Sequence, residues 1–155
     1  MALLVGWGGV ATGVNKAGVA TAHGWAYGVH PRRLIAFSLE GNADLPASPL
    51  PAVPVPLAAR EFPVKAELAM GGRAQYEGAC VFCHGGGAVA GGMAPDLRAS
   101  GVVLSETGFA DVVRGGARLQ KGMPAFRELS DEQLLELRHY IRQMAEAGLA
   151  AGPRQ

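Results

Sequence analysis

Residues 80–84, Cys80-Val81-Phe82-Cys83-His84, contain both cysteines of this 155-residue chain. The two thiols lie three positions apart, and a histidine follows the second one directly. On one helical turn, two thiols at this spacing can each add across a vinyl group of a single haem, and the adjacent imidazole can then bind the iron. The stretch therefore predicts one covalently attached haem c, held through Cys80 and Cys83, with His84 as an iron ligand.

Two other uses of a Cys-x-x-Cys pair have to be weighed against haem attachment. Half of a zinc site would need further ligands, and the chain has neither a second cysteine pair nor a His-x-x-x-His pattern. A redox-active dithiol usually follows a strand in a βαβ unit, whereas residues 72–79 have the pattern of a helix. Both alternatives are weaker than the haem interpretation.

Composition and charge limit the possible partners and the compartment. The formal net charge of +1 identifies no partner and argues against a nucleic-acid-binding face. No apolar run is long enough to span a membrane. Haem is attached to cysteines outside the bacterial cytoplasm, so we expect a periplasmic protein. Residues 1–14 are apolar but lack a basic start and are broken by glycines, so we expect the chain to begin inside a longer protein.

Residues 65–150 are predicted to form a small helical domain. Tyr76, Cys80 and Cys83 have the spacing of one helical face, and the glycines at 71 and 72 would let a second helix approach closely. Ser130 and Gln133 predict a capping box at the start of a C-terminal helix that ends at Gly148. The apolar stripe of that helix is Leu134, Leu137, Ile141 and Met144. Between the two helices, Ser105 is expected to cap a short helix that runs through Val113.

A low-spin haem needs a second axial ligand, and the methionines are the candidates. Met123 is favoured because it lies well beyond His84 in the chain and because Pro124 keeps its backbone extended. Met93 follows His84 too closely, and Met144 belongs to the apolar stripe of the C-terminal helix. A pocket-lining role for Met123, under a five-coordinate or His-ligated iron, is the alternative.

The remaining histidines and several basic residues have less specific surroundings. His23 and His30 show no metal-binding spacing, and His139 lies off the apolar stripe, so we expect it to be solvated. One of the basic residues near Met123 is a candidate for contact with a haem propionate or a redox partner: Arg114, Arg118 and Lys121.

The first 64 residues differ in character from the helical domain. Residues 3–5 and 32–39 are predicted as two β segments around a glycine-rich loop, and two strands need a further surface to cover them. Residues 46–64 contain six prolines and are expected to run extended as a semi-rigid linker. This divides the chain into strands (1–45), linker (46–64), helical domain (65–150) and tail (151–155).

Several short stretches resemble type II quinohaemoprotein alcohol dehydrogenases. Gly6-Trp7-Gly8-Gly9, residues 33–41 and Asp44-Leu45-Pro46 look like the end of the β-propeller in that family. There, a propeller that carries pyrroloquinoline quinone (PQQ) is followed by a proline-rich linker and a C-terminal cytochrome. The resemblance implies that PQQ, calcium and the catalytic groups belong to propeller sequence outside this chain, which would have no catalytic site of its own.

Residues 65–149 also resemble class I cytochromes c. The resemblance implies a mainly α fold, with crossed N- and C-terminal helices around the covalent haem. Gly122-Met123-Pro124 matches the distal-ligand loop of these cytochromes. Ala94-Pro95-Asp96-Leu97 is similar to the segment whose proline carbonyl accepts a hydrogen bond from the proximal histidine, which makes Pro95 the candidate partner of His84.

The expected function is that of a monohaem electron-transfer module. The family resemblance implies that electrons come from reduced PQQ in a propeller domain and pass to a soluble carrier or an oxidase. A free-standing class I cytochrome c is the first alternative. A haem-based ligand sensor, in which Met123 is displaced by a small molecule, is the second.

Overall fold

The computed structural model describes residues 2–5, 33–44, 54–90 and 94–152. Its strands are β1 (Ala2–Val5) and β2 (Arg33–Ala36), and its α-helices are α3 (Ala66–Ala79), α4 (Val81–His84), α5 (Glu106–Val113) and α6 (Asp131–Ala150). Four short 3-10 helices join them: η1 (Gly86–Ala88), η2 (Leu97–Ala99), η3 (Gly101–Leu104) and η4 (Leu119–Lys121). The described chain is mainly helical, as predicted.

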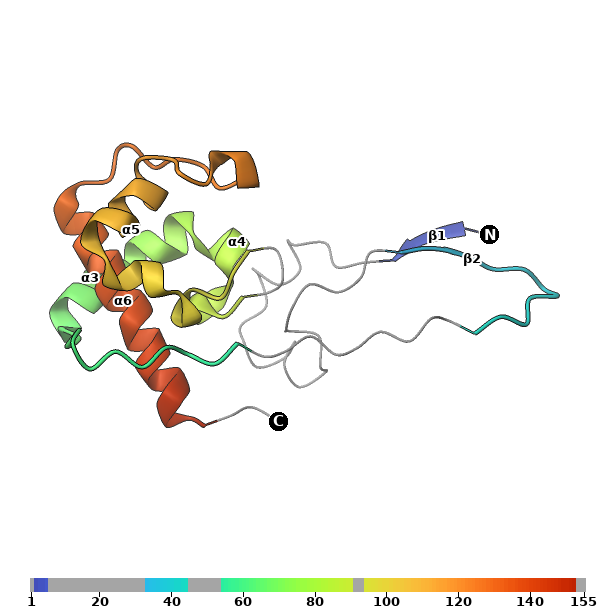
Figure 1. Ribbon diagram of the computed structural model, residues 1–155, viewed down its shortest axis with the longest axis horizontal. Coiled ribbons are helices and arrows are strands. Elements are labelled where there is room, and N and C mark those ends of the chain that lie inside the picture. Colours follow the sequence, from blue (N-terminus) through green and yellow to red (C-terminus); the bar gives the residue numbers. More distant parts are fainter. Residues whose placement is uncertain (1, 6–32, 45–53, 91–93, 153–155) are drawn as a thin grey trace.

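The helical part is built on the packing of α3 against α6 (Figure 1). A Cβ atom at Gly72 would collide with the backbone of Glu136 on α6, so only a glycine allows this approach. One turn further along, the rings of Tyr76 and Tyr140 lie 5.0 Å apart. The prediction that a glycine in this helix permits close packing is therefore confirmed.

The predicted helix starts are confirmed, and one predicted end is wrong. The Ser130 hydroxyl accepts from the Gln133 N–H at 3.2 Å, and the Gln133 side chain accepts from the Ser130 N–H at 2.9 Å. The Ser105 hydroxyl likewise caps α5 by accepting from the Gly108 N–H at 3.1 Å. Helix α6 continues through Gly148 to Ala150. A Cβ at Gly148 would lie 2.9 Å from the Pro56 ring, so this glycine makes room for a neighbouring segment rather than ending the helix.

The predicted single helical face across Tyr76, Cys80 and Cys83 is wrong in one detail. Helix α3 ends at Ala79, and Cys80, with φ −106° and ψ −27°, separates it from α4. The Cys80 N–H still donates to the Tyr76 carbonyl at 2.9 Å, and the His84 N–H donates to the Cys80 carbonyl at the same distance. The chain thus turns at Cys80 without leaving the helical hydrogen-bond pattern.

Residues 54–59, here called the strap, carry no helix or strand and lie against the C-terminal helix. The Leu57 N–H donates to the Arg98 carbonyl at 2.8 Å, and Arg142 Nη1 of α6 donates to the Leu57 carbonyl at 2.6 Å. The lack of regular structure agrees with the proline-rich composition. The strap is nevertheless tied to the helical part by long-range hydrogen bonds.

The expectation that His139 is solvated is wrong. Its side chain is buried, its ring lies 4.8 Å from the Phe62 ring, and its Nδ1 accepts from the Lys65 N–H at 3.1 Å. Arg138 and Arg142 are buried as well. The sequence predicted one buried stripe on α6, but Phe62 and Lys65, just before α3, cover a second side of the helix.

Strands β1 and β2 pair antiparallel, from Ala2 opposite Ala36 to Val5 opposite Arg33. Two strands were predicted here, and the second is shorter than the predicted 32–39 segment. The pair lies at the opposite end of the view from the helices (Figure 1). Leu34 is 69% exposed. Trp7, His23 and His30 lie outside the described residues.

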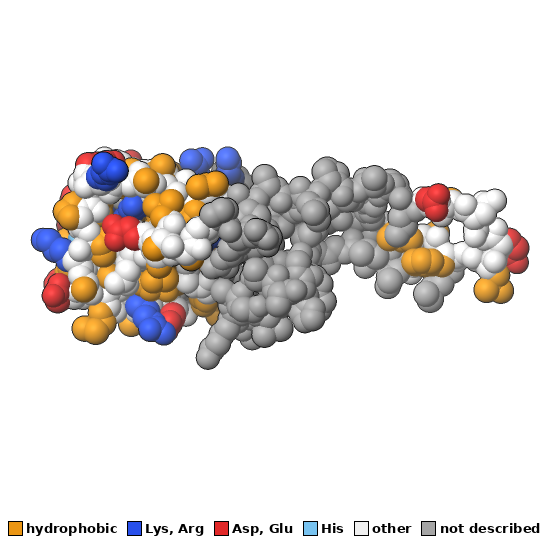
Figure 2. Space-filling model, turned by 90° about the horizontal axis from the view of Figure 1, so that it is seen from below, with side chains coloured by type: hydrophobic (Ala, Val, Ile, Leu, Met, Phe, Trp, Pro, Cys, Tyr) orange, Lys and Arg blue, Asp and Glu red, His pale blue; other side chains and the backbone are white. Residues whose placement is uncertain are grey.

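The surface of the helical part has a mixed character. Figure 2 shows basic, acidic and apolar side chains interspersed over one face of it, as a net charge near zero leads one to expect. Among the helices that the structure describes, none has both the length and the apolar character required to cross a membrane.

Candidate functional site

The two cysteines and His84 lie directly after α3: Cys80 joins α3 to α4, and Cys83 and His84 are the last two residues of α4. Both thiols are free and half-buried. Burial, with a smaller contribution from the nearby Cys83, raises the pKa of the Cys80 thiol to about 11. A redox-active dithiol needs a thiol whose pKa is lowered toward neutrality. The raised pKa therefore argues against the dithiol alternative.

His84 is buried, and its orientation is fixed by one hydrogen bond. Nδ1 lies 2.9 Å from the Pro95 carbonyl oxygen, which is the contact expected from the sequence. Because a carbonyl can only accept, Nδ1 carries the hydrogen and Nε2 keeps a free lone pair. Burial lowers the pKa of His84, although the Pro95 carbonyl opposes this shift. The neutral imidazole is the form that binds a metal.

Met123 lies on a different segment and reaches the same core. It follows Gly122, whose φ of 84° lies in the left-handed region, and its N–H donates to the Arg118 carbonyl at 3.3 Å. Its side chain is half-buried and packs against the core cluster, as Cys80 does. Met144 also packs against this core, as predicted, whereas Met70 is 75% exposed. Met93 lies outside the described residues.

The residues present fit a haem. A set of apolar side chains packs on the core while staying partly exposed, and such side chains suit a large apolar porphyrin. They come from the turn at Cys80, from α4, η2, η3, α5 and α6, and from the segment around Met123: Cys80, Val81, Leu97, Val102, Ala110, Met123, Phe126, Leu129 and Met144. An imidazole nitrogen and a thioether sulfur are common haem-iron donors. Within the described ranges, no group of three His, Cys, Asp or Glu side chains could hold a metal ion such as zinc.

The basic residues near Met123 have different surroundings. Arg114 donates to Asp131 at 2.7 Å and to the Leu129 carbonyl at 3.2 Å. It therefore links the end of α5 to the start of α6. Arg118 and Lys121 are exposed, which leaves these two as the candidates for a propionate or a redox partner.

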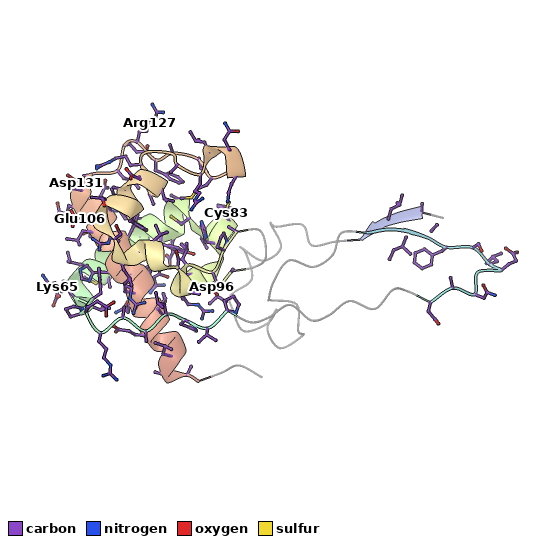
Figure 3. The ribbon with its side chains drawn as sticks, viewed as in Figure 1. Lys65, Cys83, Asp96, Glu106, Arg127 and Asp131 are labelled. Carbon is purple, nitrogen blue, oxygen red and sulfur yellow. The ribbon has the colours of Figure 1, made fainter. Side chains whose placement is uncertain are left out.

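Sequence reasoning missed a buried ion pair close to His84. Asp96 follows Pro95 directly, Arg98 follows two positions later, and Arg98 Nη2 lies 2.6 Å from Asp96 Oδ2. Cys83 and Asp96 lie toward the same end of the helical part (Figure 3). The sequence offered one signal for this pair: an acidic and a basic residue stand two positions apart, next to the residue expected to accept a hydrogen bond from His84.

Comparisons with known proteins agree with this arrangement. Residues 67–141 match the family described as cytochrome c oxidase, cbb3-type, subunit III. The chain is 35% identical over 148 residues to the dehydrogenase subunit of alcohol dehydrogenase (quinone) from Gluconobacter oxydans. That alignment covers 91% of this chain and 18% of the Gluconobacter protein. It is 35% identical over 152 residues to the quinohemoprotein alcohol dehydrogenase ADH IIB of Pseudomonas putida, and this alignment covers 91% of this chain and 20% of that protein.

A solved structure gives the same relationship. The quinohemoprotein alcohol dehydrogenase ADHIIG from Pseudomonas putida HK5 superposes with a TM-score of 0.71 at 28% identity, over 97% of this chain and 21% of that one. The chain therefore spans about a fifth of the length of these relatives. The chain contains a cytochrome c-type domain and is homologous to the quinohaemoprotein alcohol dehydrogenases.

Proposed function

We propose that this chain is a monohaem electron-transfer module, in which Cys80 and Cys83 would hold one haem c and His84 and Met123 would bind its iron. The observation that carries the proposal is the buried His84 ring, held through Nδ1 by the Pro95 carbonyl at 2.9 Å, one residue after the second cysteine. That hydrogen bond leaves Nε2 available and fixes the ring orientation. The match of residues 67–141 to a cytochrome family supports the same conclusion.

The protein side chains have separate tasks in this proposal. When bound, haem c supplies reversible one-electron exchange between ferrous and ferric iron. His84 keeps its orientation because its Nδ1 hydrogen stays on the Pro95 carbonyl. A Met123 thioether ligand raises the reduction potential relative to a second imidazole. The apolar side chains around the core exclude water, and α3 and α6 would be the crossed N- and C-terminal helices of a class I cytochrome c fold.

The relatives support a proposal about the wider setting. We place the module in a periplasmic quinohaemoprotein alcohol dehydrogenase, with residues 1–45 as the end of a PQQ-bearing propeller, 46–64 as the linker, 65–150 as the cytochrome domain and 151–155 as the tail. In that setting the module accepts electrons that originate at reduced PQQ and passes them to a soluble carrier or an oxidase. The exposed Leu34 on β2 supports a further surface covering the strands.

Expression in a bacterial host with an export leader and the c-type maturation machinery tests the proposal. The purified chain is expected to carry the added mass of one haem and to give a pyridine haemochrome spectrum of two thioether bonds. The Cys83→Ser variant is expected to shift that band to the position for a single thioether. Unmodified thiols and no Soret absorbance in the wild-type chain would exclude the proposal. Rapid, tight carbon monoxide binding to the reduced chain would favour the ligand-sensor alternative.

A further inference from the structure

A buried ion pair lies directly next to the carbonyl that orients His84. The side chains of Asp96 and Arg98 are only 1% and 5% exposed. Asp96 Oδ1 accepts from the Arg98 N–H and Nε at 3.0 Å each, and Oδ2 accepts from Arg98 Nη2 at 2.6 Å and from the Ala90 N–H at 3.4 Å. Both carboxylate oxygens are therefore occupied, each by two donors.

This pair fixes the peptide that His84 uses. The Pro95 carbonyl belongs to the peptide bond between Pro95 and Asp96, so the orientation of that carbonyl depends on where Asp96 is held. The hydrogen bond from the Ala90 N–H joins Asp96 to the segment that follows His84. A small rotation of the Asp96 backbone would move the acceptor away from His84 Nδ1, now 2.9 Å away.

The strap holds the same pair from outside. The Leu57 N–H donates to the Arg98 carbonyl at 2.8 Å, and Arg142 on α6 donates to the Leu57 carbonyl at 2.6 Å. At Gly148 an added Cβ would lie 3.2 Å from Arg98 Nη1 and 2.9 Å from Pro56 Cγ. Arg98 is thus packed between the strap and α6.

We infer that Asp96 and Arg98 are positioning residues for the proximal imidazole, and that the strap keeps them in place. The inference rests on the proposed role of His84 as a haem ligand. A firm hydrogen bond from Nδ1 raises the basicity of the imidazole, and a more basic ligand favours ferric iron. Loosening the pair should therefore raise the reduction potential of the bound haem.

The test uses the haem-loaded wild-type chain and the variants Arg98→Lys, Asp96→Asn and Arg142→Lys. Arg98→Lys keeps the charge but loses the planar fork that occupies both carboxylate oxygens, so a shift in potential reports geometry rather than charge. Arg73→Lys is the matched control, because Arg73 pairs with Glu77 on the exposed face of α3. The measurements are the reduction potential and the hydrogen exchange of His84 Nδ1–H by NMR in the ferrous form.

Arg98→Lys and Asp96→Asn are expected to raise the potential and to speed Nδ1–H exchange about fivefold, the factor for losing one typical net hydrogen bond. Arg142→Lys should shift the reduction potential and the exchange rate in the same direction by smaller amounts. Arg73→Lys should leave the potential and the exchange rate unchanged. If Arg98→Lys holds no haem, the other two variants decide. Wild-type potential and exchange in the variants that hold haem overturn the inference and leave the proposed function intact. A wild-type chain that takes up no haem overturns both.

Discussion

The two segments that carry the proposed axial ligands are built differently. On the proximal side, His84 lies in a segment with several other buried residues: Ala88, Ala90, Asp96 and Arg98. On the distal side, Met123 is half-buried, and all the remaining residues between 117 and 124 are exposed. One ligand is embedded in the core, and the other sits in a surface loop.

Their hydrogen bonds differ in the same way. The proximal segment is joined to a distant part of the chain by the hydrogen bond from the Leu57 N–H to the Arg98 carbonyl. The distal loop is closed by short-range turns, such as the Lys121 N–H to the Arg118 carbonyl at 2.8 Å and the Gly122 N–H to the Leu119 carbonyl at 2.9 Å. Local turns open at lower free-energy cost than contacts that depend on the whole core. The proximal side should therefore respond to global stability, while the distal side should respond locally.

The largest effect is expected when the haem cannot attach. In a Cys80→Ser/Cys83→Ser double variant, the apolar side chains that pack around the core lose the surface that would cover them, and a domain this small has little other core to rely on. We expect largely unfolded protein, with poor dispersion in the NMR spectrum and reduced helical circular dichroism. A well-dispersed spectrum of the haem-free chain would mean that the proximal segment holds its shape without the cofactor.

The contact between α3 and α6 supplies the next largest effect. A Gly72→Val variant places side-chain atoms where the Glu136 backbone lies, and we expect a loss of about 3 kcal/mol in the free energy of unfolding. Gly78→Ala is the control on the same helix, because a Cβ there meets nothing within 4 Å; it should stabilise the domain by about 0.5–1 kcal/mol. Urea unfolding of the two haem-loaded variants provides the comparison. Equal stabilities would contradict the role of Gly72 in the close packing of α3 on α6.

The contrast between local and long-range contacts also explains what the sequence could and could not predict. Cys80, Cys83 and His84 are adjacent in the chain, so their grouping follows from spacing alone. The caps at Ser105 and Ser130 are also local signals, and the structure confirms both. The approach of α3 to α6 was foreseeable because only a glycine permits it.

What the sequence did not reveal depends on contacts between distant residues. Leu57 looked like part of a free linker, yet it bonds to Arg98 and Arg142. His139 looked solvated because the residues that bury it, around Phe62 and Lys65, lie more than seventy positions away. A helical-wheel pattern reports the polarity of one helix and carries no information about which segment covers its second side.

On the distal side, Met123→Ala is expected to have a moderate effect on stability and a large local effect. A half-buried side chain is lost from a loop, so the free energy of unfolding should fall by about 1 kcal/mol, and the haem should stay attached. The loss of the thioether should lower the reduction potential and open the iron to carbon monoxide or imidazole, measured by optical titration. Met70→Ala, at an exposed position on α3, should change neither property. A Met123→Ala variant with wild-type potential and no ligand binding would remove Met123 from the iron.

The smallest effect is the pH dependence that His139 gives to the stability of the helical part, through its contact with the start of α3. Burial, together with Lys65 and Arg138, lowers the pKa of His139 from its ordinary 6.5. The folded state therefore binds fewer protons than the unfolded state. The contribution of His139 is fully present above pH 6.5 and is lost as pH falls toward the folded-state pKa, by at most about 1.4 kcal/mol per pH unit. Protonation also removes the acceptor for the Lys65 N–H at the start of α3.

The variant His139→Asn tests this contribution, because it keeps an acceptor near Nδ1 without titrating. Urea unfolding at pH 7.5 and 5.5 should show that this variant loses less unfolding free energy on acidification than the wild type does. Hydrogen exchange at pH 5.5 should rise more in α3 than in the Met123 loop; equal acid losses in both proteins would exclude His139 as the cause.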